Sequence, residues 1–195
     1  GVSAAYEIAR AGHAVTLLEA RGLAAMASSW TLGGVRQSGR DPAELPLAQA
    51  AVERWAGLDV ELDAPTGYRR RGNLRLARTE AEVTVIRELV RQQGALGLAI
   101  EYLPDNAAVR DKAPAIGPGI LAASFCPGDG NADPVPAVHA YAAAARRHGA
   151  VIREGIAVRR LARSGNRVTG VETQAGQTIA AGRVVVATGI HAPEL

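Results

Sequence analysis

Cysteine, lysine and aromatic residues are scarce in this sequence. Cys126 is the only cysteine, which excludes an internal disulfide and a cysteine-based zinc site and fits a reducing cytoplasm. Lys112 is the only lysine and lies in a polar, loop-like stretch, so we expect no Schiff-base chemistry. No apolar run approaches the length of a membrane span. We therefore expect a cytoplasmic protein with no membrane span and no metal site.

A strong excess of charge is also missing. The formal net charge is +3, and the arginines are spread along the chain. The densest group, Arg69 to Arg71 with Arg75, has only Tyr68 as an aromatic neighbour, and aromatic residues make up 4% of the chain. Nucleic-acid surfaces concentrate basic residues and often interleave aromatic ones, so this group favours a solvated strand face. We expect no nucleic-acid partner.

The sequence has neither a starting methionine nor a basic-then-apolar leader, and it begins at Gly1. We expect a fragment, or a chain whose start is missing, that is neither secreted nor embedded in a membrane. With 195 residues, 48% of them apolar, the chain is suited to one domain or to one domain with an insertion.

What the sequence does contain is a helix, a stop and a strand in its first segment. Apolar residues recur at helical spacing from Val2 to Ala9, and Gly12 is able to take the left-handed conformation that ends a helix. The apolar run from Ala14 to Leu18 has the length of a buried strand.

The strand ends on an acidic residue, Glu19, which follows Gly1 by 18 residues (19 − 1). A dinucleotide-binding glycine loop and its ribose-binding acid are separated by about 20 residues. If Gly1 is the last glycine of such a loop, the helix N-terminus faces a pyrophosphate and the Glu19 carboxylate accepts hydrogen bonds from a ribose diol. The alternative is an ordinary helix–strand unit with a charged residue at the strand end.

Residues 21–39 show no helical period, whereas a plain nicotinamide-binding domain has a helix here. Small residues fill positions 24–29, which lets the backbone approach a ligand closely. The groups able to contact such a ligand are the hydroxyls of Ser28 and Ser29, the N–H groups of Gly33 and Gly34, and the charge of Arg36. A flexible surface loop is the alternative.

The rest of the chain alternates helical and strand patterns. The expected helices start at Asp41-Pro42, with a stripe of Leu47, Ala51, Trp55 and Leu58, at the Thr79–Glu82 capping box, and at Asp133-Pro134. The expected strands are 72–77, 100–103, 120–125, 150–153, 156–162, 168–173 and 184–189. A proline-rich loop is expected between 104 and 118, and His139 and His148 are expected to be solvated.

Together these segments resemble the FAD-dependent amine and amino-acid oxidases of the D-amino-acid oxidase family. The resemblance spans nearly the whole chain in order. Its parts are Gly1-x-x-x-Ala5 through Leu18-Glu19-Ala20, Ser28-Ser29, Gly33-Gly34-x-Arg36, Asp129-Gly-x-x-Asp133-Pro134, and Val184-Val-Val-Ala-Thr-Gly189. It implies an α/β fold, in which a Rossmann-like FAD-binding domain with a three-stranded β-meander occupies residues 1–41 and 128–195. An α+β part of a substrate domain is inserted at 42–127, and the first strand and the C-terminal part of the family fold are lacking.

The resemblance also implies a set of site residues. Glu19 is expected on the adenosine ribose, Val158 on the adenine through its backbone, and Arg36 near the flavin ring. The full set expected to bind FAD is Gly1, Glu19, Ala20, Ser28, Ser29, Gly33, Gly34, Val158, Ala187, Thr188 and Gly189. Cys126 does not fall where the family anchors its flavin, so non-covalent FAD is expected.

The implied reaction is oxidation of a C–N bond in a small amine or amino acid, with hydride transfer to flavin N5 followed by imine hydrolysis. Arg36 or Arg40 is able to pair with a substrate carboxylate, and each is equally able to be a structural ion-pair partner. The other catalytic residues stay unassigned. Hydrolase chemistry is disfavoured, because Ser28 and Ser29 have no histidine at an informative spacing and no G-x-S-x-G motif occurs.

Two alternatives to this enzyme remain open. The chain is either a non-catalytic flavin-binding subunit or a truncated remnant, or, less favoured, part of an NAD-dependent dehydrogenase. The choice of amine, the electron acceptor (oxygen, a quinone or a partner subunit) and the oligomeric state are not determined by the sequence.

Overall fold

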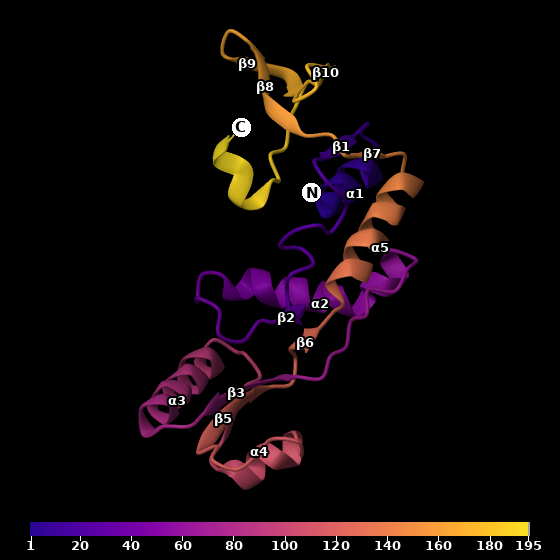
Figure 1. Cartoon of the computed structure of the whole chain (residues 1–195). Coiled ribbons are helices and arrows are strands. Elements are labelled where there is room, and N and C mark those ends of the chain that lie inside the picture. The colour runs from indigo at the N-terminus through magenta and orange to yellow at the C-terminus, as the bar shows by residue number, and fades with distance from the viewer. Residues whose placement is uncertain (195) are drawn as a thin grey trace. The chain divides into compact units, whose positions relative to one another are not determined.

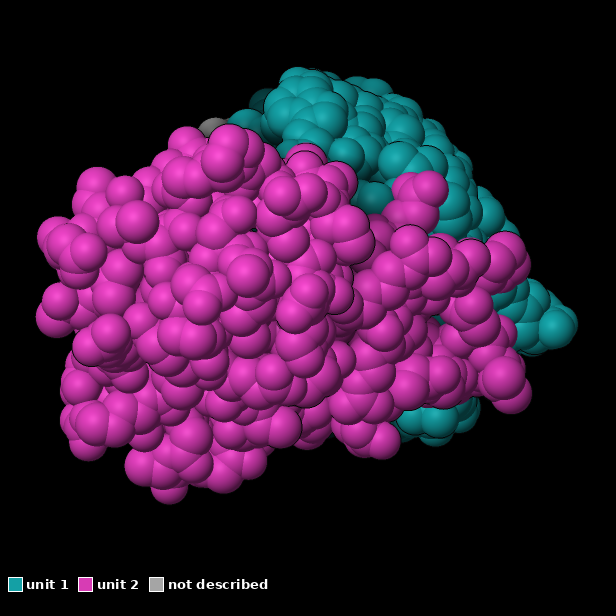
Figure 2. Space-filling view, turned by 90° about the horizontal axis from the view of Figure 1, so that it is seen from below, with its two compact units in different colours: residues 1–31, 62–64, 134–195 teal, residues 32–61, 65–133 magenta. Residues whose placement is uncertain are grey.

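The computed structural model describes residues 1–194, which divide into two compact units. Unit 1 comprises residues 1–31, 62–64 and 134–195, and unit 2 comprises residues 32–61 and 65–133 (Figure 2). The fold is mixed α/β, as the sequence predicts (Figure 1).

Unit 1 begins with helix α1 (Val2–Arg10) and strand β1 (Thr16–Glu19), which confirms the predicted helix, stop and strand. Gly12 ends the helix with φ of +84°, and its N–H donates to the carbonyl of Ala9 at 2.9 Å. Glycine adopts this left-handed conformation without the steric cost that a side chain brings.

Helix α5 (Pro134–Arg147) packs against α1 in the core of unit 1. Tyr6 is 1% exposed, and its ring centroid lies 5.7 Å from those of Tyr141 and His148. The buried side of α5 consists of alanines, which lets the two helices approach closely. His139 and His148 are exposed, as predicted.

Strand β7 (Val151–Glu154) runs parallel to β1, and the two strands end together because Glu19 pairs with Glu154 (Figure 1). A three-stranded antiparallel meander follows, in the order β10–β9–β8. Its strands are β8 (Val158–Ser164), β9 (Arg167–Thr173) and β10 (Thr178–Ala180). The sequence pattern predicted β8 and β9 but not the short strand β10.

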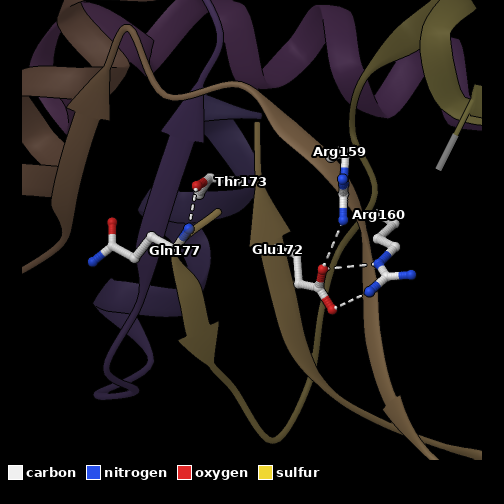
Figure 3. A network of polar contacts seen from close by, with 5 residues as sticks. All are labelled: Arg159, Arg160, Glu172, Thr173 and Gln177. Carbon is white, nitrogen blue, oxygen red and sulfur yellow. Dashed lines mark hydrogen bonds and ion pairs between the residues drawn. The ribbon is translucent and has the colours of Figure 1, made fainter. Parts of the chain in front are cut away.

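Cross-strand charges stabilise the meander on one face. Glu172 of β9 accepts hydrogen bonds from Arg160 at 2.8 Å and from Arg159 at 3.3 Å (Figure 3). At the next residue of β9, the hydroxyl of Thr173 accepts the N–H of Gln177 at 3.1 Å, which closes the turn toward β10 (Figure 3). These ion pairs are exposed, so solvent screens them and they contribute little to stability.

The prediction of a strand at residues 184–189 is wrong. Residues 183–188 have no regular structure, and the chain then forms the 3-10 helix η1 (Gly189–Glu194). Val185 is 63% exposed. A strand exists only when a neighbour supplies its ladder of hydrogen bonds, and no described residue pairs with this segment.

Unit 2 is built on an antiparallel sheet with the strand order β3–β5–β4. The strands are β3 (Asn73–Ala77), β4 (Glu101–Leu103) and β5 (Ala122–Cys126). Helices α3 (Glu80–Ala95) and α4 (Asn106–Lys112) lie on opposite sides of this sheet (Figure 1). Apolar residues of α3 pack on Ala77 and Ala122, and those of α4 pack near Leu103 and Ala123.

The two helices differ in how well the sequence predicted them. The capping box at the start of α3 is present, with the Thr79 hydroxyl accepting the N–H of Glu82 at 3.3 Å. Helix α4 lies where a loop was expected, and Asp105 caps it by accepting the N–H of Ala108 at 2.8 Å. Lys112 therefore ends a helix, where it pairs with Glu101 at 3.0 Å.

Helix α2 (Leu45–Glu61) starts later than predicted and buries a different stripe. The Asp41 carboxylate accepts the N–H of Ala43 at 2.8 Å, which forms a separate turn before the helix. Leu47 is 76% exposed, and Ala51 is exposed as well. The buried face is formed by Leu45, Val52 and Leu58, with Trp55 half-buried. The predicted stripe was therefore right at Trp55 and Leu58 and wrong at Leu47 and Ala51.

Strand β2 (Gly34–Val35) pairs with β6 (Gly130–Asn131) in unit 2. These two short strands form a sheet of their own, in which the segment that follows residue 31 pairs with the segment that precedes α5. The arginines at positions 69–71 and Arg75 are exposed, as predicted.

Candidate cofactor site

Glu19 occupies the carboxyl end of β1 in unit 1 and is partly buried. One carboxylate oxygen, Oε1, accepts the N–H of Arg21 at 2.9 Å. The other oxygen has no hydrogen-bond partner within residues 1–194. The side chain is thus held in place by one oxygen while the other is available to accept hydrogen bonds from a ligand.

Gly1 caps α1 without a side-chain hydrogen bond. Its carbonyl accepts the N–H of Ala5 at 3.0 Å, and a Cβ added to it would lie 3.7 Å from Leu17 of β1. The start of α1 therefore adjoins the strand that carries Glu19. The first N–H groups of a helix have no intrahelical acceptor and favour an anion.

The segment after Glu19 is irregular, as expected, but it is not a loose loop. The N–H of Leu23 donates to the carboxylate of Glu154 at 2.9 Å, and the N–H of Trp30 donates to the carbonyl of Met26 at 3.2 Å. Ala24 has φ of +61°, a conformation that alanine rarely adopts. Ala20 is exposed just ahead of this segment.

The two candidate serines differ in what their hydroxyls do. Ser29 donates its hydroxyl to the carbonyl of Met26 at 3.0 Å. Ser28 is exposed and has no hydrogen-bond partner in the described part of the chain. Ser28 is therefore the better placed of the two to donate to an anionic ligand.

Main-chain hydrogen bonds link Glu19 to the segment that leads into β8. The N–H of Ile156 donates to the carbonyl of Glu19, and the N–H of Gly155 donates to that of Arg21, both at 2.9 Å. Val158 follows two residues later and begins β8 beside a β-bulge. The structure thus brings Gly1, Glu19 and Val158 into one connected region.

Ala187, Thr188 and Gly189 are not tied to that region. All three are exposed, and the described hydrogen bond in this stretch is local, from the N–H of His191 to the carbonyl of Thr188 at 3.2 Å. Their proposed place at the cofactor depends on the fold of the longer family members rather than on contacts seen here.

Unit 2 holds Gly33, Gly34, Arg36 and Arg40 on a loop that buried polar side chains fix. Asp129 is fully buried and accepts the N–H of Gln37 at 2.8 Å and the N–H and hydroxyl of Ser38. Gln93 of α3 is 4% exposed. Its side-chain oxygen accepts the N–H of Gly39 at 2.9 Å, and its amide donates to the carbonyl of Arg40 at 3.1 Å.

The sequence did not reveal these two anchors. The sequence pattern placed Asp129 in a motif of the family resemblance without assigning its side chain a role, and Gln93 was not singled out. Their partners lie far away in the chain, and the N–H of Gln37 is 92 residues from Asp129. A signal that was present is an Asp between two glycines, since such turns often carry a side chain that bonds to main chain.

The two candidate arginines are not equivalent. Arg36 is partly buried, and its Nε lies 3.7 Å from where a Cβ on Gly34 would stand. Within the described residues its guanidinium forms no ion pair. Arg40 lies 3.9 Å from the carboxylate of Glu44 and donates to the carbonyl of Arg36 at 3.4 Å. Arg36 therefore has the free planar donor pair that a carboxylate requires.

Tyr68 presents a further polar group that the sequence analysis did not assign. Its hydroxyl is buried and has no hydrogen-bond partner in the described structure. Its ring packs 5.8 Å from that of Trp55, in the cluster that includes Val35. Burial raises the pKa of Tyr68, so the hydroxyl stays protonated and able to donate.

Cys126 is 1% exposed. Burial, and then the nearby Asp129 carboxylate, raise the pKa of its thiol to about 11. Because the thiolate is the reactive form, this cysteine is a weak nucleophile at neutral pH.

The described residues contain no group of three or more His, Cys, Asp or Glu side chains arranged to hold a metal ion. None of the helices in residues 1–194 combines the length and apolar character needed to cross a membrane.

Comparison with known proteins defines the class. The family model for FAD-dependent oxidoreductases, DAO, matches residues 1–195, so the chain belongs to this family. The FAD cofactor and the α/β fold inferred from the sequence are thereby confirmed at the level of the family.

Individual relatives agree with this assignment. The chain is 29% identical to 4-methylaminobutanoate oxidase (formaldehyde-forming) of Paenarthrobacter nicotinovorans over 199 residues, covering all of this chain and 24% of the relative. It is 32% identical to D-amino acid dehydrogenase of Cereibacter sphaeroides over 250 residues, covering all of this chain and 57% of that protein. Among solved structures, glycine oxidase from Geobacillus kaustophilus superposes with a TM-score of 0.91 at 26% identity, over 100% of this chain and 54% of that one.

The chain thus spans about a quarter to little more than half the length of these relatives.

Proposed function

We propose that the protein is an FAD-dependent oxidoreductase that oxidises the C–N bond of a small amine or amino acid. The observation that carries the proposal is Glu19, a carboxylate at the end of β1 with one oxygen fixed by Arg21 and the other without a partner among residues 1–194. It lies on the strand that adjoins the start of α1, a helix N-terminus without a side-chain cap, in a chain that belongs to an FAD-dependent family.

Unit 1 is assigned to FAD. The chemistry of its groups fits a dinucleotide: an acceptor for a ribose diol at Glu19, first-turn N–H groups of α1 for phosphate, and the free hydroxyl of Ser28. The backbone at Val158 would meet the adenine. Ala20, Ser29 and residues 187–189 are assigned to the same cofactor from the family resemblance alone.

Unit 2 is assigned to one wall of the substrate pocket. The relatives' names mention 4-methylaminobutanoate, D-amino acids and glycine, each of which carries an amino group and a carboxylate. Arg36 would pair with the carboxylate of such a substrate, and the buried anchors Asp129 and Gln93 would keep its loop in place.

The cofactor and the protein side chains have different roles in this proposal. FAD, when bound, would accept one hydride from the amine, and with it the two electrons of the oxidation. The chain's own residues bind the nucleotide, orient the substrate by its carboxylate and exclude water from the pocket.

The test is the visible absorption spectrum of the protein at its natural length, before and after anaerobic addition of pooled amines and amino acids. We expect a yellow protein whose flavin band bleaches. A yellow protein that no member of a broad panel bleaches would support a non-catalytic flavin-binding subunit instead. A colourless protein that binds NAD would support a nicotinamide dehydrogenase.

A further inference from the structure

Glu154 ends strand β7 directly beside Glu19 of β1. Because the two strands are parallel, both carboxylates lie at the same edge of the sheet, where α/β folds bind their ligands. Like charges at paired positions repel, so this arrangement needs compensating contacts. The compensating contacts of Glu19 differ from those of Glu154.

The contacts of Glu154 point toward the loop after β1. Its Oε2 accepts the N–H of Leu23 at 2.9 Å, across 131 residues of sequence. Its Oε1 lies 3.6 Å from the guanidinium of Arg146, which offsets its charge. A Cβ added to Gly22 would lie 3.5 Å from Oε2, so the loop passes close to the carboxylate.

The remaining hydrogen bonds of this loop are local or involve main chain only. Ala25 donates to Gly22 at 3.2 Å, and the guanidinium of Arg21 donates to the sulfur of Met26 at 3.0 Å. Across the described residues, two side chains from outside the segment form hydrogen bonds with residues 21–29: the adjacent Glu19, which accepts the N–H of Arg21, and Glu154, the one that is distant in sequence.

The loop conformation also needs support. Ala24, the residue after Leu23, has φ of +61°, in the left-handed region that a residue with a Cβ avoids. A conformation of this kind persists only when neighbouring contacts hold it. Two hydrogen bonds flank Ala24: the main-chain bond from Ala25 to Gly22 inside the turn, and the bond from Leu23 to Glu154, which ties the turn to β7.

We infer that Glu154 is a positioning residue that holds residues 22–29 in the conformation that binds FAD. The inference rests on the proposed function of unit 1. Glu154 acts through the Leu23 N–H, and its ionised oxygen is a stronger acceptor than a neutral one. It sets the path of the backbone that carries Ser28, whose free hydroxyl is proposed to meet the cofactor.

The test compares Glu154→Ala with Glu154→Gln in the protein at its natural length. Glutamine keeps an acceptor oxygen, whereas alanine removes it. We expect the FAD dissociation constant to rise about tenfold in Glu154→Ala and by no more than about threefold in Glu154→Gln. The matched control is Glu172→Ala, which removes a carboxylate with two arginine partners from the same unit and should leave FAD affinity unchanged.

A second readout addresses the loop itself. Amide hydrogen exchange at Leu23 in the FAD-free protein should become faster in Glu154→Ala and stay close to wild type in Glu154→Gln. The thermal midpoint of the FAD-free protein should change little, because the Glu154 side chain is 42% exposed.

The outcomes separate the two proposals. Wild-type protein that binds no flavin would overturn both. Wild-type protein that binds FAD, with Glu154→Ala equal to it in affinity and in Leu23 exchange, would overturn the positioning role alone. A Glu154→Gln variant as weak as Glu154→Ala would also overturn it, because the acceptor oxygen would then not be what matters.

Discussion

Units 1 and 2 hold their candidate residues by different means. In unit 1, Glu19 and Glu154 stand at strand ends, are partly open to solvent and each form one hydrogen bond to a main-chain N–H. In unit 2, the loop that carries Arg36 is held by hydrogen bonds to the side chains of Asp129 and Gln93, which are both buried. Buried polar anchors are costly to disturb, whereas strand-end contacts affect mainly the ligand they serve. We therefore expect substitutions in unit 2 to change stability and those in unit 1 to change cofactor affinity.

The largest effect is expected from Asp129→Ala. The substitution leaves two N–H groups and the Ser38 hydroxyl without their acceptor in the interior, which should lower the free energy of unfolding by about 3 kcal/mol. Urea denaturation would measure the loss. The control is Asp111→Ala, an exposed acid on α4, and equal stability of the two variants would contradict the anchoring role of Asp129.

Glu19→Ala should come next and should act on cofactor affinity. Loss of an acceptor for two ribose hydroxyls is expected to weaken FAD binding about 100-fold, with the unfolding free energy nearly unchanged. Titration of FAD-free protein with FAD, followed by fluorescence, is the measurement. If Glu19→Ala retained the wild-type affinity, the assignment of FAD to this strand end would be wrong.

A smaller effect is expected on the substrate side, where Arg36 and Arg40 are compared directly. Arg36→Gln should raise the KM for an amino-acid substrate roughly 30-fold, because a charge-assisted pair with the carboxylate is lost. Arg40→Gln should change it by less than about twofold, since its exposed contact with Glu44 contributes little. A substrate whose carboxylate is converted to a neutral amide should not distinguish the two variants, and the reverse ranking would assign the carboxylate to Arg40.

The smallest effect at neutral pH is expected from ionisation of the Cys126 thiol, which changes the stability of the protein only at high pH. Burial raises its thiol pKa from 9.0 to about 11, so the folded protein holds the thiol proton more tightly than the unfolded chain does. This contribution to stability is complete below pH 9 and declines as the pH rises through about 11. A thiol reagent should label the native protein slowly at pH 8 and the urea-unfolded protein at once, and rapid labelling of native protein would show that the thiol is not buried.

Local patterns predicted the parts of the fold that depend on neighbours in sequence. The helix before Gly12, the Thr79–Glu82 capping box and the strand ending at Glu19 are all present. Each is governed by contacts between residues a few positions apart. The same reasoning missed α4, because it is one short helix between prolines, and β10, because three residues carry little pattern.

The sequence by itself determined the class of this protein, since the order and spacing of its motifs point to an FAD-dependent oxidoreductase fold and place an acid at the end of β1. Only the tertiary structure decided which groups are occupied and which are free. It distinguished Arg36 from Arg40, left residues 184–188 without a strand partner, and brought Glu154 to Leu23 and Asp129 to Gln37. The reason is physical: these hydrogen bonds join positions 92 to 131 residues apart, and packing of the chain, not local propensity, brings such positions together.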